Sequence, residues 1–204
     1  MWPMLALAMI SEQITRFFAG MERYFRYMDI DPDVKDKPDA IKLKNVEGEI
    51  SFDNVWFRYD NDDILKGINL TINPGETVAL VGPSGAGKTT ITSLIPRFYD
   101  PYQGNLLVDG HDIRDVKLQS LRDNIGLVMQ NDYLFSDTLI NNIAYGRLDA
   151  AQEEVFEAAR QANVDKFAEE LPDGYETQIG QRGTKVSEGQ AQRISIARAL
   201  LKDP

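Results

Sequence analysis

The first 28 residues carry the hydrophobic pattern of one long amphipathic helix. Residues 1–10, MWPMLALAMI, are apolar, and from Ile10 to Met28 apolar residues recur at steps of three and four positions. This spacing places them in one stripe on a helix surface. The apolar decapeptide is too short to cross a bilayer, and no basic segment precedes it as in a signal peptide. Two interpretations remain open: the cytosolic end of a membrane helix, or a peripheral helix on a soluble core.

Residues 29–47 are predicted to form an extended linker. The stretch 29–44, DIDPDVKDKPDAIKLK, contains two prolines and five aspartates and offers almost nothing apolar to bury. A folded domain is therefore expected over residues 48–204.

Alternating apolar positions predict that this domain opens with antiparallel strands. Ile50 and Phe52 alternate with polar residues, and Val55, Phe57 and Tyr59 do so with the opposite parity, which indicates a strand with a bulge or bend. The segment INLTI continues as strand. The segment NPGE then has the proline and glycine of a type II turn, after which ETVALV at 76–81 is expected to return as a strand.

Beyond residue 88 the pattern alternates between helices and strands. Strands are expected at 104–110, ending in a turn, and at 125–130. Helices are expected at 89–98, 150–162, 165–171 and 188–202. The domain thus begins with strands and continues with alternating helices and strands. This order implies an α/β sandwich with an added helical block.

Composition and charge exclude several classes of function. The chain has 204 residues, 43% of them hydrophobic, which is ordinary for one substantial globular domain. Its 32 acidic and 22 basic residues give a net charge of −10 without a basic cluster, which argues against nucleic acid as a partner. The absence of cysteine excludes disulfides, thiolate zinc sites and cysteine nucleophiles, and one histidine cannot build a histidine-based metal site.

The stretch GPSGAGKTT at 82–90 fits the phosphate-binding pattern G-x-x-x-x-G-K-[ST], between a predicted strand and a predicted helix. Glycines allow backbone N–H groups to wrap a β-phosphate closely. Lys88 would reach the β- and γ-phosphates, and the Thr89 hydroxyl would bind Mg²⁺. The alternative is a glycine-rich turn that arose by chance. The expected nucleotide contacts are Gly82, Pro83, Ser84, Gly85, Ala86, Gly87, Lys88, Thr89 and Thr90.

Later segments resemble the ATP-binding cassette (ABC) proteins. The stretch VSEGQAQRISIARALL at 186–201 is similar to the family's L-S-G-G-Q signature and the helix after it. Residues 125–147 are similar to its Q-loop region, with Gln130 in the glutamine position, and TQIGQRG at 177–183 resembles the loop before the signature in exporters. Tyr59 stands where the family has its adenine-stacking aromatic. The resemblance covers essentially the whole chain.

The resemblance implies an α/β fold with a P-loop NTPase core, an N-terminal antiparallel β layer and an inserted α-helical subdomain, preceded by the amphipathic helix. It implies that Gln130 reaches Mg²⁺ or the attacking water. Ser187 is a natural N-cap, and with Gly189 and Gln190 it would complete the nucleotide pocket of a second cassette. The implied partners are a second nucleotide-binding domain and a transmembrane domain. Residues 1–28 would then be the cytosolic end of its last membrane helix, at the cytoplasmic face of the cell membrane.

Two departures from the family pattern affect the predicted chemistry. Glu188 replaces a signature glycine, and we expect its carboxylate to point away from the nucleotide. The sequence also lacks, after the signature helix, the strand ending in Asp and Glu (Walker B) and the later histidine (H-loop). Asp109 and His111 do not replace them, because LLVDG precedes the signature, Asp109-Gly110 is a turn pair and His111 follows that turn. Residues 48–204 are therefore predicted to be an incomplete nucleotide-binding domain that is inactive by itself.

The leading hypothesis is the ATP-binding part of an ABC exporter subunit, which in the complete protein couples ATP binding and hydrolysis to transport across the membrane. One alternative is a cassette that binds ATP without hydrolysing it and acts as a regulatory module. The other is a soluble cassette ATPase.

Overall fold

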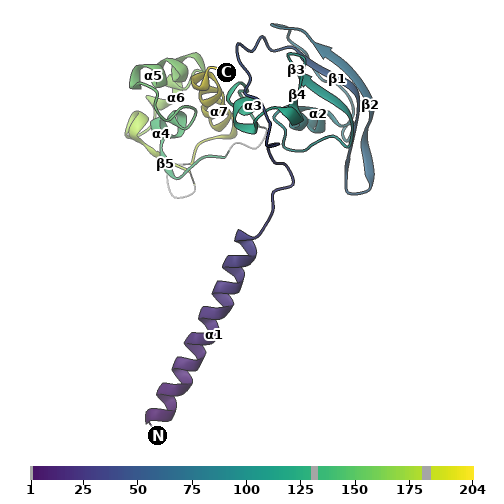
Figure 1. Cartoon of the computed structure of the whole chain (residues 1–204). Helices are drawn as coiled ribbons and strands as arrows, with labels where there is room; N and C mark the ends of the chain where they lie inside the picture. Colours follow the sequence, from purple (N-terminus) through teal and green to yellow (C-terminus); the bar gives the residue numbers. More distant parts are fainter. Residues whose placement is uncertain (1, 130–132, 181–184) are drawn as a thin grey trace. The chain divides into compact units, whose positions relative to one another are not determined.

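The computed structural model describes residues 2–129, 133–180 and 185–204. These divide into two compact units, Met1–Lys35 and Asp36–Pro204. The first unit contains helix α1 (Trp2–Met28), which confirms the predicted helix (Figure 1). Its side chains Phe17, Phe25 and Met28 are exposed. None of the helices that the structure describes is both long enough and apolar enough to span a membrane.

The second unit starts with linker residues. Residues 36–49 contain no strand or helix, but Ile41 forms an isolated parallel bridge with Val116, and Ala40 is buried. The latter part of the predicted linker thus packs on the folded unit.

A four-stranded antiparallel sheet follows. Its strands are β1 (Ile50–Tyr59), β2 (Asp62–Ile72), β3 (Gln103–Val108) and β4 (His111–Asp112), in the order β2-β1-β3-β4 (Figure 1). The register of β1 against β2 shifts between Phe52 and Val55, where Asn54 has a φ of 46°. This irregularity confirms the predicted bulge.

The hairpin between β3 and β4 has the predicted turn. Asp109 and Gly110 have φ angles of 48° and 74°, the left-handed conformation that a two-residue hairpin loop requires. The Asp109 carboxylate also accepts hydrogen bonds from the backbone N–H groups of Glu47, Gly48 and Glu49. His111 is exposed at the start of β4.

Two of the predicted strands are wrong. The turn at Asn73–Glu76 forms, but neither 76–81 nor 125–129 is a strand in the described part of the chain. Val81 is 93% exposed and Met129 is 58% exposed. A strand requires a neighbour that satisfies its backbone groups, and no described strand pairs with either run. Hydrophobic pattern alone cannot reveal whether that neighbour is present.

Two short helices and the sheet share one hydrophobic core. Helix α2 (Lys88–Leu94) contributes Leu94, and helix α3 (Leu118–Asp123) contributes Leu121. The 3₁₀ helix η1 (Ile113–Asp115) precedes α3. The sheet residues of this core include Phe52, Val55, Leu65 and Leu106.

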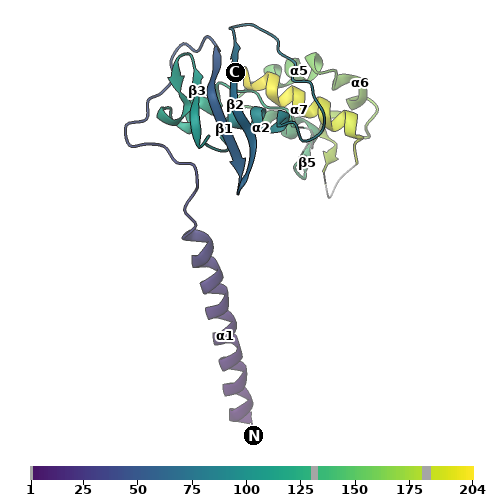
Figure 2. The same ribbon diagram turned by 90° about the vertical axis from the view of Figure 1, so that its right-hand side faces the viewer.

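A helical block has a second core of its own. It comprises α4 (Leu139–Ala144), α5 (Gln152–Gln161), α6 (Asp165–Ala168), the 3₁₀ helix η2 (Gly174–Glu176) and α7 (Glu188–Lys202). Figure 2 shows α5, α6 and α7 of this block. Val155, Ala158 and Ala159 of α5 are buried in it, on the side that the sequence predicts. A two-stranded pairing of β5 (Asp137–Thr138) with β6 (Gln178–Ile179) was not predicted. The fold is therefore mixed α/β with a separate helical part, as expected.

Candidate functional site

The glycine-rich loop 82–87 has a backbone that only glycine adopts readily at two positions. Gly85 and Gly87 have φ angles of 81° and 84°, in the left-handed region. A Cβ on Gly87 would lie 2.7 Å from Cδ2 of Leu65, whereas a Cβ on Gly85 would meet no atom of the part of the chain that the structure describes within 4 Å. Gly87 is thus held by packing against β2, while the space beside Gly85 stays open to a ligand.

Lys88 lies over this loop. Its Nζ donates hydrogen bonds to the carbonyl oxygens of Gly82 and Pro83, at 2.9 Å and 2.7 Å. These bonds curl the side chain back over the loop, so the positive charge lies beside the exposed residues 83–86. The arrangement holds a cation beside an exposed backbone loop, which suits an anionic ligand.

The start of α2 offers backbone donors. Its N-cap, Gly87, makes no side-chain capping bond, which leaves N–H groups of the first turn available to an anion. Thr89 is exposed, and its hydroxyl makes no hydrogen bond to any residue that the structure describes. Thr90 is only 6% exposed, so its side chain faces the core.

A magnesium site would depend mainly on the nucleotide itself. No group of three or more metal-ligating side chains exists among the described residues. Mg²⁺ usually takes one or two protein ligands together with substrate phosphates and water, which fits the free hydroxyl of Thr89.

Tyr59 lies at the end of β1 in an aromatic group. Its ring packs edge-on against Phe57 and Tyr99, with centroids 4.8 Å and 5.2 Å away. The side chain is 40% exposed. The neighbouring rings therefore fix Tyr59 while leaving part of its surface available for stacking.

The predicted cap at the start of α7 is confirmed. Ser187 Oγ accepts from the N–H of Gln190 at 3.3 Å, and Gln190 Oε1 accepts from the N–H of Ser187 at 2.8 Å. This reciprocal capping box engages the Gln190 side chain; it was not predicted, although the S-x-x-Q spacing of Ser187 and Gln190 is its sequence signature. A Cβ on Gly189 would meet no atom of the described residues within 4 Å, and Glu188 is exposed. Packing against the described part of the chain therefore does not require glycine at position 189.

Gln130 and residues 181–183 lie outside the described residues. Residues 133–138, which come soon after Gln130, are held by hydrogen bonds to Asn142 and Arg198. Neither of these two residues was predicted to have a role. Asn142 is fully buried, and Arg198 donates to the carbonyl oxygens of Tyr133 and Asn142. The signal that could have revealed this contact is Asn142 itself, a polar residue on the buried face of the short helix α4.

A family profile described as ABC transporter matches residues 65–204. The chain therefore belongs to the ABC transporter family, as its phosphate loop and capped signature helix indicate.

Relatives match along nearly the whole chain. It is 51% identical over 98% of its length to the ATP-dependent lipid A-core flippase of Syntrophus aciditrophicus, and 50% identical over 99% to the putative multidrug export ATP-binding/permease protein YgaD of Bacillus subtilis. A solved bacterial Atm1-family ABC exporter with ATP bound has a TM-score of 0.87 and 45% identity over 97% of this chain. The chain covers 33%, 35% and 35% of these proteins, about a third of each.

Proposed function

We propose that this chain is the ATP-binding part of an ABC exporter subunit and binds ATP with Mg²⁺ at the phosphate loop. The observation that carries this proposal is the placement of Lys88 Nζ over the Gly82 and Pro83 carbonyls, beside an open loop and an uncapped helix start. The loop N–H groups and Lys88 would hold the phosphates, and Thr89 would hold the metal. Tyr59 would stack on adenine.

The signature residues would act on a second cassette. Ser187 fixes the start of α7, and Gly189 presents bare backbone in open space. A γ-phosphate carried by another nucleotide-binding domain could approach there without meeting a side chain. The partners are therefore a second nucleotide-binding domain and a transmembrane domain. In this proposal Gln130 senses the metal or the attacking water.

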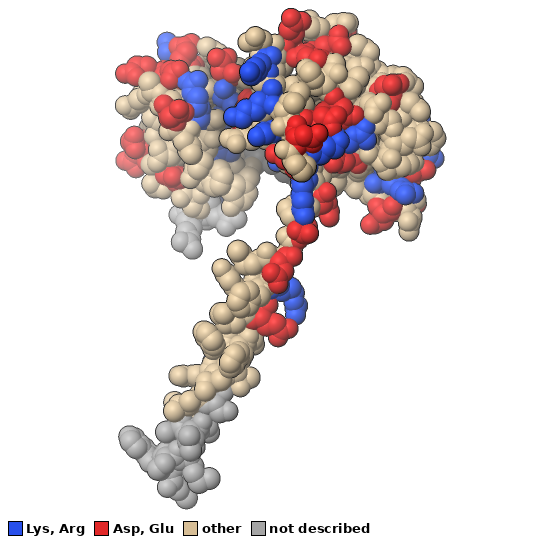
Figure 3. All heavy atoms as spheres, in the orientation of Figure 1, with Lys and Arg blue, Asp and Glu red and all other residues tan. Residues whose placement is uncertain are grey.

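Hydrolysis is assigned to the whole protein. For residues 1–204 by themselves we expect ATP binding without turnover. The match to exporters includes α1 and the linker, which supports an exporter over a soluble cassette or a purely regulatory one. Residues 1–28 would continue a membrane helix at the cytoplasmic face of the membrane. Figure 3 shows Lys and Arg alongside acidic residues on one face, and the net charge of −10 argues against nucleic acid as a partner.

Titration with magnesium-ATP tests the proposal. Replacing Lys88 by alanine should weaken binding at least about tenfold, because a charged hydrogen-bond donor to the phosphates is lost. The control is Lys66→Ala, which removes an exposed lysine of β2 and should leave binding unchanged. Folded protein that takes up no magnesium-ATP, or takes it up equally well without Lys88, would contradict the proposal.

A further inference from the structure

Residues 36–43 of the linker, here termed the strap, are bound to the segment 115–120. Ile41 N–H donates to the carbonyl oxygen of Asp115 at 2.9 Å, and Lys117 N–H donates to the carbonyl oxygen of Ile41 at 2.8 Å. Leu43 N–H donates to Ser120 Oγ at 3.0 Å. Backbone bonds on both sides of Ile41 fix the strap in one register, as in a short parallel strand pair.

The strap also caps helix α3. The N-cap residue of α3, Lys117, makes no side-chain capping bond. Instead, Leu118 N–H donates to Oδ1 of Asp36 at 2.7 Å, across 82 positions of sequence. Lys37 forms an ion pair with Asp115 beside it. Helix α3 therefore begins with a carboxylate supplied by the strap, which favours the positive end of the helix.

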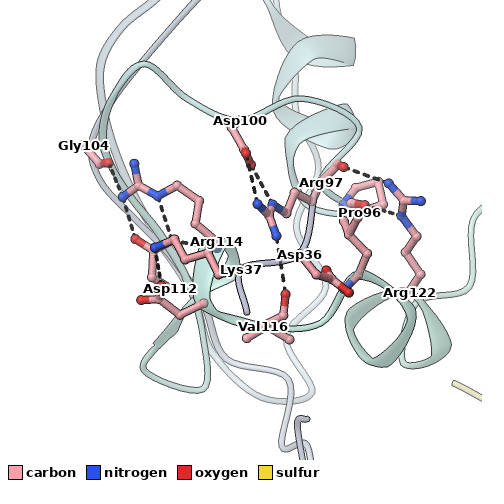
Figure 4. Close-up of polar contacts among 12 residues, drawn as sticks. Asp36, Lys37, Pro96, Arg97, Asp100, Gly104, Asp112, Arg114, Val116 and Arg122 are labelled. Atoms are coloured by element: carbon pink, nitrogen blue, oxygen red, sulfur yellow. Dashed lines mark hydrogen bonds and ion pairs between the residues drawn. The ribbon is translucent and has the colours of Figure 1, made fainter. Parts of the chain in front are cut away.

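The same segment holds the end of the phosphate-loop helix. Figure 4 shows Arg122 of α3 reaching the chain just after α2. Its Nε donates to the carbonyl oxygen of Pro96 and its Nη2 to that of Arg97, both at 2.9 Å. In return Arg97, which is 2% exposed, donates to the carbonyl oxygen of Val116 at 3.4 Å. Val116 is the residue that bridges to Ile41 of the strap.

Helix α3 is bound to the signature helix as well. Lys202, at the end of α7, donates from Nζ to the carbonyl oxygens of Arg122 and Ile125, at 2.6 Å and 3.0 Å. Three elements thus meet on α3: the strap at its start, the end of α2 through the Arg122 side chain, and the end of α7 through the carbonyls at its end. Two of these elements, α2 and α7, begin at residues that are proposed to contact nucleotide.

We propose that strap binding and nucleotide binding are coupled through α3, with Asp36 and Arg122 as positioning residues. Nucleotide that fixes α2 also fixes Pro96 and Arg97, and these hold Arg122 and Val116 in the place where the strap binds. By linkage, a bound strap favours nucleotide by the same factor that nucleotide favours the strap. Nucleotide binding at the phosphate loop thereby stabilises the bound state of the strap, the chain segment that leads to α1. This inference rests on the proposed function.

Amide hydrogen exchange in the full chain tests the coupling. Saturating magnesium-ATP should slow exchange of the Ile41 and Leu43 amides at least about fivefold, the lower end of typical coupling. Without nucleotide, Asp36→Ala should speed exchange at Leu118 about fivefold, the effect of losing one helix cap, while Asp36→Asn should restore it because an amide oxygen also caps. The matched control Asp39→Ala removes an exposed carboxylate three positions away.

The decisive variant is Arg122→Ala, with Arg122→Lys as a milder version. It leaves the strap's own bonds and the Arg97–Val116 bond in place but removes the two bonds from Arg122 to the Pro96 and Arg97 carbonyls, so the response of the strap amides to nucleotide should weaken. Unchanged exchange at Ile41 and Leu43 in wild-type protein that demonstrably binds magnesium-ATP would overturn the coupling and leave the proposed function standing. Failure to bind magnesium-ATP would overturn both.

Discussion

Arg198 of helix α7 donates two hydrogen bonds to Asn142 of helix α4, from Nε to the backbone oxygen at 2.5 Å and from Nη2 to Oδ1 at 2.6 Å. Asn142 in turn accepts from the N–H of Phe135 and donates to the carbonyl oxygens of Phe135 and Thr138. The signature helix and the segment after Gln130 are therefore joined through one buried amide.

Replacing Asn142 by alanine should destabilise the protein by about 2–4 kcal/mol, because several buried partners lose their hydrogen bonds at once. Urea denaturation gives the free energy of unfolding. The matched control is Asn141→Ala, which changes the exposed neighbour and should cost less than about 1 kcal/mol. Equal losses for the two variants would contradict a structural role for the buried amide.

A substitution at Gly189 should affect function without reducing stability. Because a Cβ there meets no described atom within 4 Å, Gly189→Ala should leave the melting temperature unchanged or raise stability by up to about 1 kcal/mol. The same methyl group would occupy the space where another cassette's nucleotide is proposed to approach, so magnesium-ATP-dependent pairing of the full-length transporter should weaken. Thermal unfolding and sedimentation measure the two effects. Undiminished pairing would count against the role proposed for the signature.

Acid should destabilise the protein partly through Asp112. Burial tends to raise the pKa of this carboxyl, but hydrogen bonds from Arg114 outweigh burial and lower the pKa below its ordinary value of 3.8. A lowered pKa in the folded state means that the stabilisation is present above about pH 4 and is lost as the pH falls through the folded value. The two side chains are joined by contacts of 2.6 Å and 2.9 Å.

The variant Asp112→Asn should therefore be less stable than wild type by about 1–3 kcal/mol at pH 7, and the difference should shrink below pH 4. Urea midpoints measured from pH 7 to pH 2.5 check this. Asp53→Asn, which changes an exposed carboxylate on β1, is the control. A difference that stays constant over the whole range would show that Asp112 does not act through its charge.

Local chemistry made much of the site predictable. The glycine spacing around Lys88 and the Ser187 cap depend on neighbours within a few residues, and the structure has both. The bulge near Asn54 was visible as a change of parity for the same reason. The class of fold follows from such short-range signals.

Contacts between distant segments were not predictable. The Asp36 cap on α3 joins residues 82 positions apart, and nothing in either stretch identifies the other. At 76–81 and 125–130, by contrast, strands were predicted that the described chain does not form. An apolar run indicates that a strand is possible but not whether a neighbouring strand pairs with it. The carbonyl partners of Lys88 likewise depend on side-chain placement that spacing does not determine.

The three amides that donate to Asp109 have a practical consequence for preparing this protein. Their hydrogen bonds hold residues 47–49 against the folded unit, and the strap's hydrogen bonds hold residues 36–43. The chain ahead of the sheet therefore resists the local unfolding that proteolytic enzymes need. Limited digestion should then cut within residues 29–35. An expression clone of the folded part should accordingly begin near Asp36, twelve residues earlier than the sequence pattern would suggest.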